Sequence, residues 1–276
     1  MRKIVLALTV LAWISCAQAA PRNGGKLKHF PPEVRQTILD QLGDGRIEEA
    51  VKTSDDDGQV NYEVTIDQEG KSRDFTFAAD GKLLEKEVFL EEIPAEVRKT
   101  ITATATGIQP GSINESTDEK GLTNYDVEIV KAGVTRDFTV AADGTLASIQ
   151  VFLAEVPAGV QKTIRETVDN GTLGDITKST EDGDTSYDVE MTKDGKKREF
   201  SVNTDGELES IQVGLQETPD PVQNSILARL KDGKLDKIDK ETDDDGGSVF
   251  VATMTQNGKT QEVRITPNGH FAPAQP

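Results

Sequence analysis

The sequence predicts an α+β protein made of tandem repeats, each a short helix packed on a four-stranded antiparallel β-meander, with the last copy truncated. Three features return every 62 or 63 residues and predict four repeats, at residues 30–92, 93–155, 156–217 and 218–276. The helix starts are Pro31, Pro94, Pro157 and Pro219. The aromatic strand residues are Tyr62, Tyr125, Tyr187 and Phe250. The turns are Asp80-Gly81, Asp143-Gly144, Asp205-Gly206 and Asn268-Gly269.

Each repeat is expected to begin with a helix that has one narrow apolar face. In the second repeat, Pro94 stands where its missing N–H has no consequence, and Gly107 ends the apolar run. The apolar stripes are Val34, Ile38, Leu42; Val97, Ile101, Ala105; Val160, Ile164, Val168; and Val222, Ile226, Leu230. Because so short a helix is not stable alone in water, it must pack on a sheet.

The residues after each helix alternate between apolar and polar, which is typical of a strand with one buried face. In the first repeat this alternation runs from Val60 to Ile66, and the next strand carries Phe75 and Phe77. The Asp80-Gly81 turn then forms a hairpin, because glycine tolerates positive φ. A weaker strand comes before these and a last strand follows the turn. The fourth repeat lacks that last strand.

Residues 1–19 are typical of a cleavable signal peptide. A basic start at Arg2 and Lys3 precedes an apolar stretch too short to span a bilayer, and Ala17-Gln18-Ala19 is a small-x-small cleavage site. We expect cleavage after Ala19, which leaves residues 20–29 as a linker and makes the chain periplasmic or extracellular, with no membrane span. The alternative is a lipoprotein anchored through Cys16, although Trp13 stands where lipid-attachment signals usually carry Leu.

Cleavage would remove the only Cys and the only Trp, so the mature chain would have no disulfide and no thiol nucleophile. The formal charge would change from −18 to −20, because Arg2 and Lys3 are lost. Binding to DNA, RNA or anionic lipid needs a basic surface, so none of these partners is expected. The acidity favours solubility, cationic partners or divalent ions.

Three stretches of the second repeat resemble a known family. They are Ile-Pro-Ala-Glu-Val-Arg-Lys-Thr-Ile at 93–101, Asn-Tyr-Asp-Val-Glu-Ile at 124–129, and Arg-Asp-Phe-Thr-Val-Ala-Ala-Asp-Gly-Thr-Leu at 136–146. They resemble PepSY-like domains, small exported modules related in fold to the β-lactamase inhibitory protein, and the resemblance extends over residues 30–272 as four tandem copies. It implies a helix on a curved antiparallel sheet, used for binding or inhibition without catalytic residues.

A β-lactamase as the target is not expected. Tight interfaces usually present aromatic anchors, whereas aromatic residues make up only 5% of this chain. Most of them alternate into the predicted core, and the outward strand positions carry Asn, Asp, Glu, Thr and Ser. The resemblance is therefore used for the fold and not for the target.

An acidic turn recurs before the second strand of each repeat, and clustered carboxylates can hold calcium. The candidate ligands are Asp55, Asp57, Asp182, Asp184, Asp243 and Asp245. None of the turns has the alternating acidic order of a calcium loop, and Lys120 lies inside the second one. A solvated hairpin turn is the favoured interpretation, with weak calcium binding as the alternative.

A basic–acidic–aromatic triplet recurs in the third strand of the first three repeats. The phenylalanine points into the core, so its acidic neighbour faces outward, where it could form a cross-strand pair or join a charged stripe that steers a partner. The structural interpretation is favoured. The triplets are Arg73-Asp74-Phe75, Arg136-Asp137-Phe138 and Arg198-Glu199-Phe200.

The sequence offers little material for catalysis. Its two histidines, His29 and His270, lie outside the regular part of the repeats, and no serine stands in a nucleophile motif. We therefore predict a non-catalytic exported protein, without a cofactor, that binds a protein or peptide. Peptidase inhibition is the most concrete version. The alternative is an acidic divalent-cation-binding or structural envelope protein.

Overall fold

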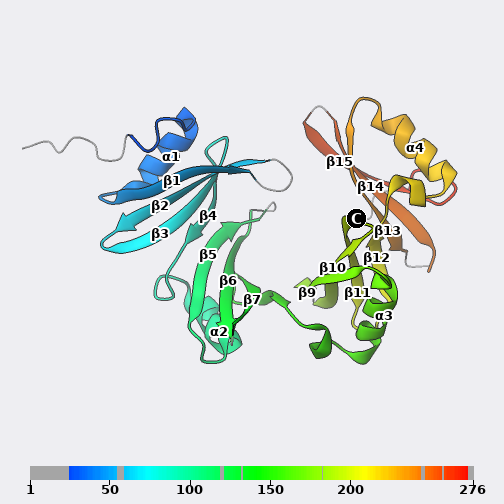
Figure 1. Cartoon of the computed structure of the whole chain (residues 1–276), viewed down its shortest axis with the longest axis horizontal. Helices are drawn as coiled ribbons and strands as arrows, with labels where there is room; N and C mark the ends of the chain where they lie inside the picture. The colour runs from blue at the N-terminus through cyan, green and yellow to red at the C-terminus, as the bar shows by residue number, and fades with distance from the viewer. Residues whose placement is uncertain are drawn as a thin grey trace, which may run out of the picture. The chain divides into compact units, whose positions relative to one another are not determined.

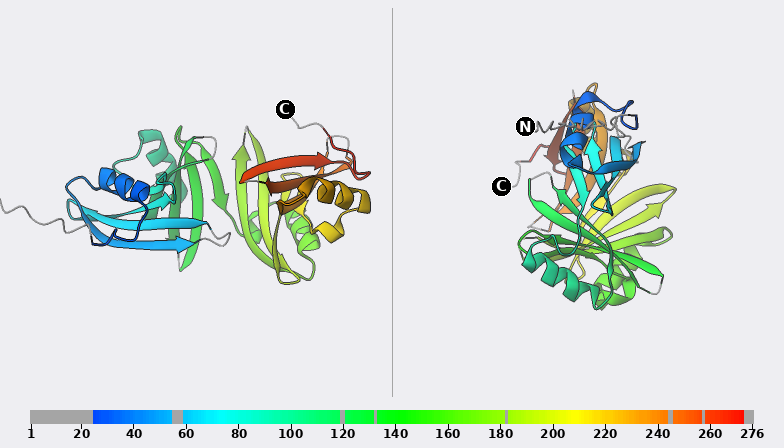
Figure 2. Two further views of the ribbon diagram at one scale, coloured as in Figure 1. Left: turned by 90° about the horizontal axis from the view of Figure 1, so that it is seen from above. Right: turned by 90° about the vertical axis from the view of Figure 1, so that its left-hand side faces the viewer.

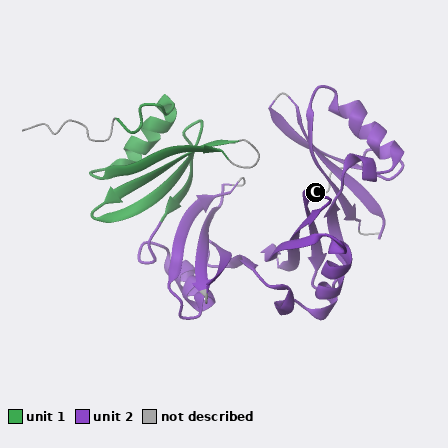
Figure 3. Cartoon of the chain, in the orientation of Figure 1, with its two compact units in different colours: residues 1–87 green, residues 88–276 purple. Residues whose placement is uncertain are grey.

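The computed structural model describes residues 25–54, 59–118, 121–131, 133–181, 183–243, 246–256 and 258–272. The chain divides into two compact units, Met1–Glu87 and Val88–Pro276 (Figure 3). The predicted signal peptide, Cys16 and the Ala19 cleavage site lie outside the described residues, so these remain predictions. The predicted repeat boundaries also remain predictions.

Unit 1 consists of one helix on four antiparallel strands (Figure 1). Pro31 precedes the helix and Pro32 lies in its first turn, where neither needs to donate a hydrogen bond. Val34, Ile38 and Leu42 are buried on the strands, as the helical spacing predicts. The elements are α1 (Pro32–Leu42), β1 (Arg46–Ser54), β2 (Val60–Gln68), β3 (Lys71–Ala78) and β4 (Leu83–Glu87).

Unit 2 contains three such helices, each followed by antiparallel strands. The α2 segment comprises α2 (Ala95–Ala105), β5 (Pro110–Thr117), β6 (Thr123–Lys131), β7 (Val134–Ala141) and β8 (Leu146–Gln150). The α3 segment comprises α3 (Ala158–Val168), β9 (Thr172–Glu181), β10 (Asp184–Lys193), β11 (Lys196–Asn203) and β12 (Leu208–Gln212). The α4 segment comprises α4 (Asp220–Leu230), β13 (Lys234–Thr242), β14 (Ser248–Gln256) and β15 (Lys259–Ile265). Short 3₁₀ turns, η1 (Leu153–Glu155) and η2 (Leu215–Glu217), precede α3 and α4.

The fold class predicted from the sequence is wrong in its central point. Instead of four repeats that each have a separate four-stranded meander, strands β5 to β15 of unit 2 form one continuous antiparallel sheet in chain order. Within unit 2, β8 pairs with β9 through Ser148–Ser179, and β12 pairs with β13 through Ser210–Glu241. The physical reason is the edge of an isolated meander, which would leave a row of backbone groups unpaired. Pairing with the next strand satisfies them.

Each helix lies on one face of the strands of its own segment (Figure 2), and the predicted apolar stripes are confirmed as the core. Val160 and Ile164 are fully buried, as are Val222 and Ile226, whereas Leu230 is half-buried. The middle of both α3 and α4 also touches the hairpin turn of the same segment. Thr163 Oγ1 donates to the carbonyl of Gly206 at 2.5 Å, and Ser225 Oγ donates to that of Gly269 at 2.7 Å. This contact fixes the helix against the end of the sheet.

The linker after β12 belongs to the core of the next segment. Val213 donates its backbone N–H to the carbonyl of Ile238 at 2.9 Å, and Val213 and Leu215 pack against the residues beneath α4. In the linker before α3, Val151 donates its backbone N–H to the carbonyl of Ile176 and packs against the core beneath α3. The three segments of unit 2 are therefore joined by hydrogen bonds and by apolar packing.

Candidate functional site

The acidic turns predicted as calcium sites are only partly described. Asp55, Asp57, Asp182 and Asp245 lie outside the described residues, and the prediction for them stays untested. Asp184 opens β10 opposite Glu181. Asp243 accepts hydrogen bonds within its own turn, with the N–H of Gly247 at 2.5 Å from its Oδ1. Among the described residues, no three acidic, histidine or cysteine side chains come together in a way that would hold a metal ion.

The more distinctive surface is the open face of the sheet in unit 2, opposite the helices. Asp188 and Glu190 alternate with buried Val189 on β10, and Lys237 and Asp239 flank buried Ile238 on β13. A hollow of about 510 Å³ lies over β9–β13. A second hollow, of about 490 Å³, shares Lys237, Asp239 and Glu241 and continues over β14 and β15. We call this the acidic face; its charged residues are Asp188, Glu190, Glu199, Arg229, Lys237, Asp239, Glu241, Glu262 and Arg264.

The centre of the acidic face in the α4 segment is apolar and buried. Val249, Val251 and Thr253 of β14 point to the open face, because Phe250, Ala252 and Met254 between them belong to the core beneath α4. Even so, they are only 5%, 6% and 9% exposed. β14 is therefore buried on both faces. The expectation that outward strand positions are polar is wrong for this strand.

Charged side chains from the flanking strands cover this apolar strip. The strand register places Thr253 between Lys237 and Glu262, and Val251 between Asp239 and Arg264. Arg264 Nη1 lies 2.7 Å from Glu241 Oε2, and Lys237 Nζ lies 3.0 Å from Asp239 Oδ2. The aliphatic parts of such side chains can pack over apolar neighbours while their charged groups pair above them. Among the described residues, Thr253 Oγ1 beneath them has no hydrogen-bond partner.

Lys237 is the electrostatic centre of the acidic face. Burial by itself would lower the pKa of this ammonium group. The hydrogen bond to Asp239 and the charges of Asp239, Glu199 and Glu262 outweigh burial, so the pKa of Lys237 is raised. Glu199 lies on β11 and Glu262 on β15, so carboxylates from both sides of the hollow act on one ammonium group.

A group of neighbouring carboxylates lies further along the same face. The pKa of Glu209 is raised by burial first, and then by the charges of Asp188, Asp184 and Glu207. Ser179 donates a hydrogen bond to Asp188 from β9. Repulsion among neighbouring carboxylates of this kind would be relieved by a cationic ligand.

The recurring triplets have a structural role that sequence reasoning missed. Arg136 and Arg198 reach across 19 residues to the linker, where Arg136 Nη2 lies 3.0 Å from Glu155 Oε2 and Arg198 Nη1 lies 2.9 Å from Glu217 Oε2. Glu155 also accepts the N–H of Phe152, and Glu217 that of Gly214. These backbone hydrogen bonds lower the pKa of both carboxyls most, and the arginines lower it further, so that together they outweigh burial, which raises it. The arginines therefore fasten the linkers rather than form a free stripe.

The acidic member of the first triplet behaves as the sequence predicts. Thr65 Oγ1 on the neighbouring strand donates to Asp74 Oδ1 at 2.7 Å. It is a local cross-strand hydrogen bond in unit 1, and it supports the structural interpretation of this residue.

Searches of family models and of curated proteins found no match to this chain. Solved structures do match. A DUF2874 family protein from Bacteroides ovatus has 13% identity and a TM-score of 0.32; the match covers 42% of this chain and 84% of that one. A BLIP-like protein from Bacteroides fragilis has the same identity and score, with 42% and 82% covered. A protein from Bacteroides vulgatus, described as periplasmic and of unknown function, has 16% identity and a TM-score of 0.30, with 45% and 93% covered.

At these identities and scores the matches do not assign the chain to a family, so the resemblance to PepSY-like domains stays a prediction. In the part of the chain that the structure describes, no helix combines the length and hydropathy that crossing a bilayer requires.

Proposed function

We propose that this protein is exported, non-catalytic and works in the periplasm by binding a basic segment of a partner protein or peptide on its acidic face. The observation that carries the proposal is the excess of carboxylates around the two hollows, above a strand that is buried on both faces. A strand buried on both faces beneath a surface with an excess of negative charge is suited to recognition, because it fixes the backbone positions from which those charges project.

Electrostatic complementarity supports a cationic partner. Asp188, Glu190 and Glu199 lie on β10 and β11, while Asp239 and Glu241 face them from β13. Lys237 and Arg264 are already engaged by Asp239 and Glu241. A lysine or arginine of the partner would pair with the remaining carboxylates and would relieve the repulsion that Asp188, Asp184 and Glu207 exert on Glu209.

The experiment compares peptides of equal length and opposite charge. The full chain is titrated with fluorescent lysine-rich and glutamate-rich peptides at low and high salt, and anisotropy is recorded. We expect only the lysine-rich peptide to bind, with an affinity that falls as salt is added. Glu199→Lys should weaken this binding about fivefold or more. The matched charge reversal Glu166→Lys, on the exposed side of α3, should leave it nearly unchanged.

Equal effects of the two charge reversals would show that overall charge, and not the acidic face, attracts the peptide. Inhibition of a peptidase is the more specific version, implied by the resemblance to PepSY-like domains. The alternative, divalent-cation binding by the acidic turns, is tested separately by calorimetric titration with calcium, since most of those turn residues lie outside the described residues.

A further inference from the structure

The linker before α3 and the linker before α4 are built alike but differ at one residue. The Phe152 N–H donates to Glu155 Oε2 at 2.8 Å, and the Gly214 N–H donates to Glu217 Oε2 at 2.5 Å. The arginine of the preceding triplet pairs with each of these glutamates. Gly214 therefore stands exactly where the earlier linker has the aromatic ring of Phe152.

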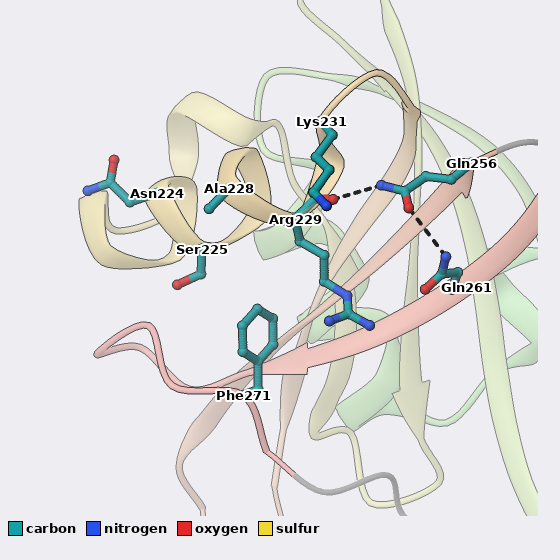
Figure 4. A pocket seen from close by; sticks show the side chains of 8 residues that line it. All are labelled: Asn224, Ser225, Ala228, Arg229, Lys231, Gln256, Gln261 and Phe271. Atoms are coloured by element: carbon teal, nitrogen blue, oxygen red, sulfur yellow. Dashed lines mark hydrogen bonds between the residues drawn. The ribbon is translucent and has the colours of Figure 1, made fainter.

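The ring of Phe152 covers an arginine. The guanidinium carbon of Arg136 lies 4.6 Å from the centre of this ring. A second contact of this kind lies beside α4, where Arg229 and Phe271 point toward one another and the corresponding distance is 5.5 Å (Figure 4). The face of an aromatic ring attracts a cation, and it does so more strongly where the cation is shielded from water. Stacking of phenylalanine on arginine is therefore a recurrent contact in unit 2.

The backbone does not require glycine at position 214. Gly214 has φ −77° and ψ 155°, close to the −92° and 152° of Phe152, and any residue adopts these angles. A Cβ at Gly214 would meet the carboxylate of Glu217 at 3.0 Å, which is the movable end of a side chain. The consequence of glycine here is the space that it leaves beside Arg198.

This space is a hollow of about 200 Å³, which we call the Gly214 hollow. An engineered protein cavity of about 150 Å³ can hold benzene, so the hollow has room for one aromatic ring. Arg198 borders it with 14% of its side chain exposed, and the half-buried Leu215 and Leu235 add apolar surface. A ring that entered would meet a shielded guanidinium group and aliphatic side chains.

The Gly214 hollow also differs in charge from the corresponding place before α3. Lys196 and Lys197 of β11 line it beside Arg198. Val134 and Thr135 occupy the same two positions of β7, immediately before Arg136 in the equivalent strand. The exchange of phenylalanine for glycine is thus accompanied by two added lysines, and the lysines would attract an anionic group.

The other charges around the hollow leave this attraction in place. The charge of Lys196 helps to lower the pKa of Glu217, so its effect reaches the linker. Asp236 is the one carboxylate in the described lining, and Lys234 Nζ lies 3.1 Å from its Oδ1. Lys237 lines the hollow as well, and it is shared with the acidic face.

We propose that the Gly214 hollow binds an aromatic side chain of a partner protein that has a carboxylate next to it. The ring would lie over Arg198 as Phe152 lies over Arg136, and the carboxylate would be attracted by Lys196 and Lys197. A phenylalanine beside an aspartate supplies both groups. The hollow adjoins the acidic face but takes a different chemical group, and the inference does not depend on a basic segment binding there.

The test titrates the full chain with three blocked peptides that differ at one position. The first is acetyl-Ala-Phe-Asp-Ala-amide; the second has cyclohexylalanine in place of phenylalanine, and the third has asparagine in place of aspartate. We expect the first to bind weakly at one saturable site and to shift the amide NMR signals of Gly214 and Leu215. Loss of the aromatic electrons or of the charge should weaken binding about threefold in each case. Equal binding of all three peptides, or shifts confined to other parts of the chain, would overturn the proposal.

Exchanging the two linker residues gives a reciprocal test. Gly214→Phe places a ring of the chain itself in the hollow and should abolish binding, while the NMR spectrum shows that the variant is folded. Phe152→Gly should open a second site before α3. The aspartate and asparagine peptides should bind equally there, because Val134 and Thr135 replace the lysines. Binding that survives Gly214→Phe, or a Phe152→Gly variant without a second site, would contradict the assignment.

A matched pair of lysine variants tests the charge. Lys196→Val should remove the preference for aspartate over asparagine, and this preference should also fall as salt is added. Lys162→Val, at an exposed position of α3, should leave the preference unchanged. Equal effects of the two variants would show that the hollow does not recognise the carboxylate. Sedimentation over a range of concentrations checks a second copy as the occupant; self-association that Gly214→Phe abolishes would overturn the assignment to a different protein.

Discussion

Strands β10 and β14 are central strands of neighbouring segments, and both place three alternate residues beneath a helix. Their opposite faces differ. β10 presents Ser186, Asp188 and Glu190 to the open side, whereas β14 presents Val249, Val251 and Thr253, all of them buried. The same backbone position is thus a solvated charged surface in one segment and a second apolar layer in the other. The helix-facing pattern is therefore common to both segments, whereas the polarity of the open face is not.

The largest expected effect comes from exchanging residues between the two strands. Val251→Asp should lower the free energy of unfolding by about 3 kcal/mol, because it buries a carboxylate beside Asp239 while Arg264 is already paired with Glu241. The reverse exchange, Asp188→Val, should change it by less than about 0.5 kcal/mol. Urea denaturation measures both. If the two exchanges cost the same, the two strands do not differ as described.

A second comparison concerns the glycine of the hairpin turn, which lies close to the start of the helix in both the α3 and the α4 segment. Gly206 has φ +87°, and a Cβ there would lie 2.7 Å from the carbonyl carbon of Gly159; Gly269 has φ +85°, and its Cβ would lie 2.7 Å from the carbonyl oxygen of Pro221. Alanine at either position should destabilise the protein by about 2 kcal/mol. Gly195→Ala, with positive φ but nothing within 4 Å, should lose only about 1 kcal/mol. If Gly269→Ala left the stability unchanged, the close contact between α4 and its turn would not contribute to stability.

The linker contacts give a smaller difference between the segments. Arg198 is largely buried beside Glu217, with 14% of its side chain exposed. Arg198→Gln should reduce stability by roughly 0.5–1 kcal/mol, since Glu217 itself is half exposed and screened. Gln261→Arg places an arginine in the α4 segment at the position of Arg198. It should not change the stability measurably, because no glutamate of a following linker is described near this position. A stabilising Gln261→Arg would reveal such a partner.

The pH dependence of the same contact has a defined sign. The pKa of Glu217 is lowered from its ordinary value of 4.5, first by the backbone N–H of Gly214 and, further down, by Arg198. The folded state therefore holds the charged form more tightly, and this stabilisation is present above pH 4.5 and lost as the pH falls through the lowered pKa. Wild type should exceed Glu217→Gln in stability at pH 7, and the difference should vanish in stronger acid. A constant difference would mean that the charge of Glu217 is not involved.

Local patterns allowed much of the structure to be predicted. The helix stripes ending at Leu42, Ala105 and Val168 are buried as expected. Apolar residues at a spacing of 3.6 lie on one face of a helix, and this face is removed from water when it packs on the sheet. The turn at Asp205-Gly206 follows from the tolerance of glycine for positive φ. The burial of β14 on both faces also had a signal, the unbroken apolar run Val249-Phe250-Val251-Ala252, which is typical of a strand covered on both sides.

Other features could not be predicted, because they join residues that no local pattern connects. The pairing of Ser210 with Glu241 turns separate meanders into one sheet, and it depends on where a strand edge meets the next segment. The contact of Arg198 with Glu217 gives the triplet its role. The acidic face likewise exists only because β11, β13 and β15 bring Glu199, Lys237 and Glu262 within reach of one another.

The secondary-structure elements, the core face of each helix and the acidic character of the chain follow from the sequence alone. These follow from backbone stereochemistry and from the free energy of removing apolar side chains from water, both of which act over a few residues. The tertiary structure alone shows that the strands of unit 2 share one sheet and which charges meet on its open face. Those outcomes depend on hydrogen bonds and Coulomb forces between residues that the fold alone brings together.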